Sequence, residues 1–157
     1  MSPRPFDEPP EPTIDLAPGA ESSPLAVRLA DLVRGNLRVR PAKLADFRAL
    51  RGTVLVVARD TGDSLTMRFD HGRLTIHDGA VGVPTVSLLA DIDDLMAIAD
   101  VPMTRLGRLP LPRIGDPTGR ERLGRIAGLV TSGELKVYGL AAHPRLVLRL
   151  LRVISVH

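Results

Sequence analysis

The stretch "SGELKVYGLAAHPRLVLRLLRVISV", residues 132–156, joins a short strand pattern to an unusually apolar helix pattern. In "ELKVYG", Leu135 and Val137 alternate with polar residues, which predicts a strand. Pro144 then opens a helical segment whose arginines fall on one stripe, at 145, 149 and 152. Apolar residues fill an arc far wider than the roughly 100° that a surface helix needs. We therefore expect this helix to face apolar surroundings on more than one side: as plain core, as the wall of a cavity or against a membrane.

The apolar residues before this stretch follow either the helical period or the strand period, so the chain can be divided into helices and strands. Leucines at helical spacing predict helices over residues 24–34 and 41–51. Period-two alternation then predicts strands over 53–59, 64–70, 73–78 and 84–90, with His71-Gly72 as a two-residue hairpin turn. Further helices are expected over 91–100 and 119–131, the second opened by a capping box of Thr118 and Glu121. Between them, residues 101–117 hold four prolines and predict an irregular, partly buried connection.

The predicted strands are grouped apart from the helices, which is typical of an α+β fold. Each strand has one apolar and one polar face, as expected of an antiparallel sheet covered on one side only. We therefore predict five mainly antiparallel strands with the helices packed on one face. Residues 1–23 hold six prolines and five acids, so we expect a disordered acidic tail, followed by one domain over 24–157.

Composition and charge limit the function. There is no Cys, which excludes thiol chemistry and disulfides, and no pair of histidines stands at metal-binding spacing. No nucleophile elbow, dinucleotide fingerprint or phosphate loop is present, so we expect neither an enzyme nor a cofactor. Aromatic content of 3% disfavours nucleic-acid binding. Residues 1–23 carry a net charge of −4 and residues 102–157 carry +7. No secretory signal is expected, and a cytoplasmic location follows from that.

The predicted order is a helix, four strands, two helices, a fifth strand and an apolar terminal helix. Over residues 41–156 this order resembles the lipid-binding domain of the sterol carrier protein family. "LTMRFDHGRLTIHDG" (65–79) resembles the second and third strands of that family, and "PTVSLLADIDDLMAIAD" (84–100) resembles its fourth strand and following helix. The resemblance implies an apolar cavity between sheet and helices, and non-catalytic binding or transfer of a fatty acyl, sterol, prenyl or phospholipid molecule. The proline-rich connection at 101–117 departs from the pattern.

The resemblance selects candidate residues for such a cavity. The expected lipid-binding residues come from the last helix, the fifth strand and the segment after the fourth strand: Leu95, Met96, Met103, Leu135, Val137, Val147, Leu150, Leu151 and Ile154. Each of them could equally be an ordinary core residue. Arg120, Arg122 and Arg125 are candidates for docking on an anionic membrane. The alternative hypothesis is an interaction or accessory subunit of a lipid- or quinone-metabolism complex, with a filled core.

Overall fold

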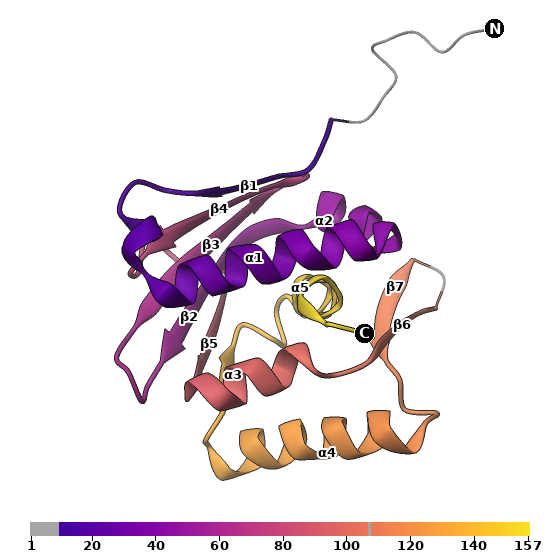
Figure 1. Ribbon diagram of the computed structural model, residues 1–157. Helices are drawn as coiled ribbons and strands as arrows, with labels where there is room; N and C mark the ends of the chain where they lie inside the picture. Colours follow the sequence, from indigo (N-terminus) through magenta and orange to yellow (C-terminus); the bar gives the residue numbers. More distant parts are fainter. Residues whose placement is uncertain (1–9, 107) are drawn as a thin grey trace, which may run out of the picture.

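The computed structural model describes residues 10–106 and 108–157, and it consists of a six-stranded sheet with helices on one face (Figure 1). The strand order is β1-β4-β3-β2-β5-β8. These strands are β1 (Thr13–Leu16), β2 (Arg51–Ala58), β3 (Ser64–Asp70), β4 (Arg73–Asp78), β5 (Val86–Ala90) and β8 (Lys136–Tyr138). The helices are α1 (Pro24–Val39), α2 (Leu44–Ala49), α3 (Ile92–Ala99), α4 (Pro117–Ser132) and α5 (Pro144–Ile154), with short 3₁₀ turns η1 (Ala20–Ser22) and η2 (Pro41–Lys43).

The β3–β4 hairpin forms where the sequence predicts it. Its turn residues, His71 and Gly72, have φ angles of 45° and 96°, the pair of positive values that a two-residue hairpin turn requires. Leu65 and Phe69 of β3 are buried, and so are Leu74 and Ile76 of β4, whereas the alternate residues are more exposed apart from Thr66, whose hydroxyl bonds Gly79 and Val81. The arrangement of the helices on one face of the sheet confirms the predicted α+β class.

The prediction of five mainly antiparallel strands is wrong in two respects. The sheet has six strands, and it is mixed: β2 pairs with β5 in parallel, and β1 pairs with β4 in parallel. Residues 79–85 run back along the sheet after β4, so that β5 starts beside the start of β2, where the Thr85 amide donates to the Thr53 carbonyl at 2.8 Å. Alternation along a strand is the same for both directions, so the sequence pattern does not distinguish them.

The expectation of a disordered tail over residues 1–23 is wrong for the part that forms β1 and η1. The Thr13 amide donates to the Gly72 carbonyl, and the Ala17 amide donates to Ile76. The Arg34 guanidinium on α1 donates to the Ile14 carbonyl at 2.9 Å, which attaches the strand to the helix layer. Residues 1–9 lie outside the described residues.

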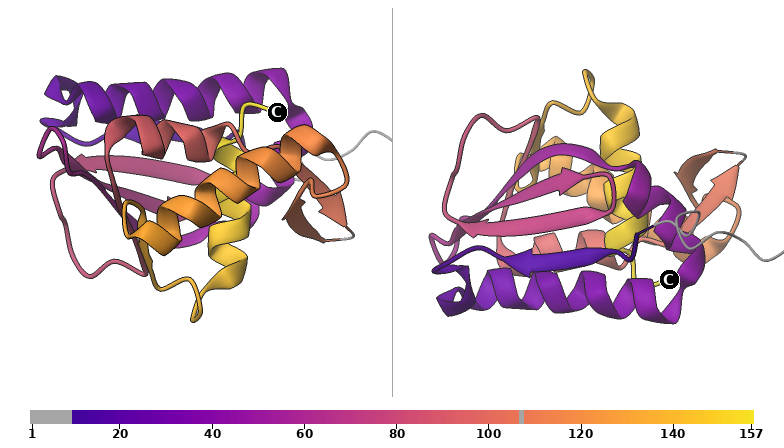
Figure 2. Two further views of the ribbon diagram at one scale, coloured as in Figure 1. Left: turned by 90° about the horizontal axis from the view of Figure 1, so that it is seen from below. Right: turned by 90° about the horizontal axis from the view of Figure 1, so that it is seen from above.

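The segment 101–117 is also more regular than expected. It forms a second, two-stranded sheet from β6 (Met103–Leu106) and β7 (Leu109–Pro112), an antiparallel hairpin that projects from one end of the molecule (Figure 2). Prolines are tolerated here because the hairpin is only two strands wide and the missing N–H groups can face outward. The expectation of an irregular connection, which was based on the prolines, is therefore wrong for β6 and β7.

The last helix, α5, lies in the middle of the helix layer. Figure 1 views it nearly end-on, surrounded by the sheet, α1 and α3, and it also contacts α2 and the β6–β7 hairpin. Its residues Val147, Leu150, Val153 and Ile154 are buried. Packing on several sides explains the wide apolar arc of this helix. None of the helices in the described part of the chain is long and apolar enough to cross a bilayer.

Candidate functional site

A small apolar pocket lies in the interior between sheet and helices. Its volume is about 30 Å³, roughly a tenth of the ~300 Å³ at the lower end of ligand pockets. The lining side chains come from α1, α3, α5 and three strands, and all are apolar: Leu25, Leu29, Val56, Met67, Leu88, Leu95, Met96, Ile98, Leu150 and Ile154. The interior is therefore filled mostly by its own side chains.

Four of the nine predicted lipid-binding residues, Leu95, Met96, Leu150 and Ile154, meet in this pocket. Leu135 and Val147 are buried in the same core, and Val137 and Leu151 pack against it half-buried. These four share the core but do not line the pocket. The wide arc of α5 is divided among several neighbours, so only part of it faces this space.

Sequence reasoning missed six of the lining residues, although it predicted the helices and strands that carry them. Leu25 and Leu29 come from α1, and Val56, Met67 and Leu88 come from the inward faces of β2, β3 and β5. Ile98 is the last of them, on α3. The helical spacing of Leu25 and Leu29 and the alternation along β3 and β5 were visible in the sequence, but only the packing of α1 across the sheet brings these residues to one point.

Met103 lies elsewhere. It is buried and lines a cleft of about 430 Å³, whose basic lining residues are Arg40, Lys43, Arg113, Arg152 and His157. Lys43 is only 2% exposed, and its Nζ donates to the Ser155 carbonyl just after α5. Burial, together with the charges of Arg40 and Arg152, lowers the pKa of Lys43 to about 8. Met103 is thus a contact of a polar cluster, contrary to its expected place in a lipid cavity.

The basic residues of α4 differ in their surroundings. Arg122 forms an ion pair with Asp100 at 2.8 Å, and its guanidinium also donates to the Asp100 carbonyl and contacts His157 Nε2, both at 2.6 Å. Arg120 and Arg125 are exposed. Arg122 therefore fastens α4 to the end of α3, and membrane docking stays a prediction for Arg120 and Arg125.

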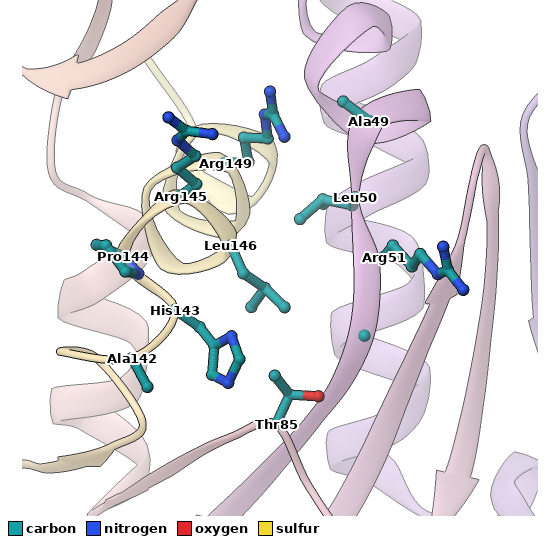
Figure 3. Close-up of a pocket in the computed structure, with 11 residues that line it drawn as sticks. Ala49, Leu50, Arg51, Thr85, Ala142, His143, Pro144, Arg145, Leu146 and Arg149 are labelled. Atoms are coloured by element: carbon teal, nitrogen blue, oxygen red, sulfur yellow. The ribbon is translucent and has the colours of Figure 1, made fainter.

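A larger, open groove of about 620 Å³ lies between the start of β2 and the first half of α5 (Figure 3). Its walls are apolar in the middle, where Leu50 and Leu146 project into it. Arg145 and Arg149 lie at one end in this view, and His143 and Thr85 lie at the other. Sequence reasoning did not single out this groove, because its two walls are about ninety residues apart in the chain.

The fold has counterparts among solved structures. A structure described as "UbiJ-SCP2 Ubiquinone synthesis protein" superposes with a TM-score of 0.54 at 19% identity, covering 82% of this chain and 90% of that one. The chain has a sterol-carrier-protein-type fold. A crystal structure of sterol carrier protein 2 gives a TM-score of 0.47 at 14% identity, over 81% of this chain and 91% of that one. No model of a protein family matches the sequence, and no curated protein matches it significantly.

Relative to the five-stranded sheet that the resemblance implied, this sterol-carrier-type fold carries β1 as an extra edge strand and the β6–β7 hairpin beside α5. Among residues 10–106 and 108–157, His, Asp and Glu side chains form no group of three or more that could hold a metal ion. The apolar interior pocket and the groove at the start of α5 are thus two candidate sites, beside the basic cleft at Lys43.

Proposed function

We propose that the protein binds an apolar lipid without catalysis, and transfers it, in the interior between the sheet and α1, α3 and α5. The observation that supports this most directly is the pocket where these elements meet, which has ten apolar lining side chains and no polar one. Two of the ten are methionines, Met67 and Met96, whose flexible thioethers adapt to ligands of different shape. The sterol-carrier-type fold is consistent with this use of the interior.

Binding requires the pocket to widen about tenfold, from about 30 Å³ toward the size of a lipid site. We propose that the layer of α3 and α4 moves outward, because α4 is the outermost helix (Figure 2) and most of its side chains are exposed. Each methylene group that leaves water contributes about 0.8 kcal/mol. A chain of ten methylenes thus gains roughly 8 kcal/mol, which can offset such a rearrangement.

The test is native mass spectrometry of the purified full chain, followed by solvent extraction and lipid analysis. We expect a bound acyl, sterol, prenyl or phospholipid species at near-stoichiometric level. A clean ligand-free mass, together with no uptake of a fluorescent fatty acid, would contradict lipid binding.

The second candidate function is an interaction or accessory subunit of a lipid- or quinone-metabolism complex. The filled interior favours it, since a core that holds only about 30 Å³ of free space needs no ligand. The similar solved structure is described as a ubiquinone synthesis protein, which fits this candidate as well. A ligand-free mass with specific co-purification of metabolic enzymes would support it over lipid binding.

A further inference from the structure

Positive charge collects at the groove beside α5 without a matching negative charge among the described residues. Arg145 and Arg149 are four residues apart on α5, so their side chains are neighbours on one helix face. Within residues 10–106 and 108–157, neither forms an ion pair, and the first turn of α5 has no acid. The Nε atom of Arg149 is buried and has no hydrogen-bond partner in the same residues.

This arrangement is unfavourable for the helix by itself. Like charges at a spacing of four residues repel, and cations near the positive end of the helix dipole add to the cost. An oxyanion bound between the two guanidinium groups would remove both penalties, and arginine presents the planar donor fork that phosphate and carboxylate groups accept. Arg51 also lines the groove, although its side chain points away from α5 in Figure 3.

The apolar walls of the groove continue toward the interior pocket. On α5, Leu146 lines the groove, whereas Leu150 and Ile154, four and eight residues later on the same face, line the pocket. On β2, Gly52 lines the groove and Val56, on the same side of the strand, lines the pocket. Leu146 and Leu150 are separated by only about 6 Å along the helix axis. Two apolar stripes therefore lead from one space to the other.

Leu146 is held against β2 in the wall of the groove. It lies directly against the backbone of Gly52, so closely that a Cβ on Gly52 would be 2.6 Å from Leu146 Cδ1. Gly52 also has a φ of 136°, which other residues rarely adopt. The glycine thus provides the recess in which the Leu146 side chain is held.

We propose that the groove binds the oxyanion headgroup of a lipid through Arg145 and Arg149, and that Leu146 is the gate through which the attached chain enters the interior. The inference rests on the proposed function, because it names the entrance and the headgroup chemistry of the same interior site. It selects anionic lipids, which carry a phosphate or a carboxylate, over neutral ones of equal chain length.

The headgroup is tested by isothermal titration calorimetry of the full chain with decyl phosphate, decanol and inorganic phosphate. We expect decyl phosphate to bind at least about tenfold more tightly than decanol, since charge-assisted hydrogen bonds add to the chain burial. Arg145→Gln with Arg149→Gln should remove most of this difference and leave decanol binding unchanged. The control, Arg28→Gln with Arg73→Gln, removes two exposed arginines elsewhere and should change neither affinity.

The outcomes separate the headgroup inference from the proposed function. If decanol binds but decyl phosphate binds no better, or if the Arg145 and Arg149 variant keeps the preference, the headgroup site is overturned while lipid binding stands. If inorganic phosphate binds as tightly as decyl phosphate, the groove is a site for a free anion, and the link to the interior is overturned. If neither alkyl ligand binds, both proposals are overturned.

The gate is tested separately by stopped-flow association of decyl phosphate. Leu146→Ala should raise the association rate several-fold, because the smaller side chain no longer fills the recess at Gly52. Leu148→Ala is the matched control, a half-buried leucine of the same helix that lines neither space. An unchanged rate in Leu146→Ala, with a circular dichroism spectrum like that of the wild type, would overturn the gate.

Discussion

Asp46 and Arg152 form a buried ion pair that fastens α5 to α2. Asp46 is only 1% exposed, and its Oδ2 lies 2.9 Å from Arg152 Nε and 4.0 Å from Arg105 Nε. The 2.9 Å contact is not aligned as a hydrogen bond, so charge attraction carries it. In the sequence, Arg152 belongs to the exposed-looking stripe of Arg145 and Arg149. Its burial shows that the three arginines of α5 have different roles.

Lys43 gives the folded protein a stability that depends on pH. Its pKa is lowered from the ordinary value of 10.5 to about 8 by burial, and by the charges of Arg40 and Arg152. Below pH 8 the amine is charged in both the folded and the unfolded chain, and its burial destabilises the fold in full. Between about pH 8 and 10.5 the unfolded chain binds more protons than the folded one, so stability rises with pH.

We therefore expect the free energy of unfolding to increase by up to roughly 3 kcal/mol from pH 8 to pH 10.5, in urea denaturation of the wild type. Lys43→Met keeps a side chain of similar length without the charge, and its stability should not show this rise. The change of the free energy of unfolding with pH is compared, and not its absolute value, because the variant also loses the hydrogen bond to Ser155. If the free energy of unfolding changes with pH equally in the wild type and in Lys43→Met, the prediction is wrong.

At the scale of elements, α4 is capped two residues earlier than the sequence pattern indicates. The Asp116 side chain accepts a hydrogen bond from the Gly119 amide at 2.7 Å, and Pro117 opens the helix, so the predicted capping box of Thr118 and Glu121 is wrong. A Cβ at Gly119 would lie 1.9 Å from the Arg113 carbonyl oxygen. The first turn of α4 therefore packs closely on the chain that leaves the β6–β7 hairpin.

Asp116→Ala should lower the free energy of unfolding by about 1 kcal/mol, the usual value of an N-cap. Thr118→Ala, the matched control two residues later, should change it by less than about 0.5 kcal/mol, because Thr118 is exposed and makes no cap bond. Chemical denaturation of both variants measures the difference. A larger loss of stability in Thr118→Ala than in Asp116→Ala would show that Thr118 caps the helix, as the sequence pattern predicts.

At the scale of the whole molecule, the charge asymmetry of the chain is distributed over several structures. The basic third, +7 over residues 102–157, forms ion pairs through the half-buried Arg122 and the mostly buried Arg152, and it also carries exposed basic groups on α4 and outside it. Among the exposed groups, Arg120 and Arg125 lie on α4 and stay the predicted contacts of an anionic membrane.

Arg120→Glu with Arg125→Glu should weaken binding to vesicles that contain anionic phospholipid by at least about tenfold, since each basic group near such a surface contributes about 1 kcal/mol. Co-sedimentation at low and high salt measures the effect. Arg38→Glu with Arg73→Glu makes the same change of charge on α1 and β4, and this control should bind nearly as well as the wild type. If both variants lose vesicle binding equally, net charge alone explains the binding, and the prediction of docking through α4 is wrong.

The sequence by itself determined the elements whose signals are local. Alternation placed β3 and β4, two residues tolerant of positive φ placed their turn, and the wide apolar arc of α5 required neighbours on several sides. These features follow from contacts between residues a few positions apart, so a periodic pattern records them. The α+β class followed from their order.

Only the tertiary structure decided which distant segments meet. It paired β2 with β5 in parallel, joined Lys43 to Ser155 and Asp46 to Arg152, and brought the start of β2 against Leu146. It also reduced the expected lipid cavity to a pocket of about 30 Å³ and placed an open basic groove beside it. Each of these depends on close packing between segments far apart in the chain, and local periodicity contains no information about that packing.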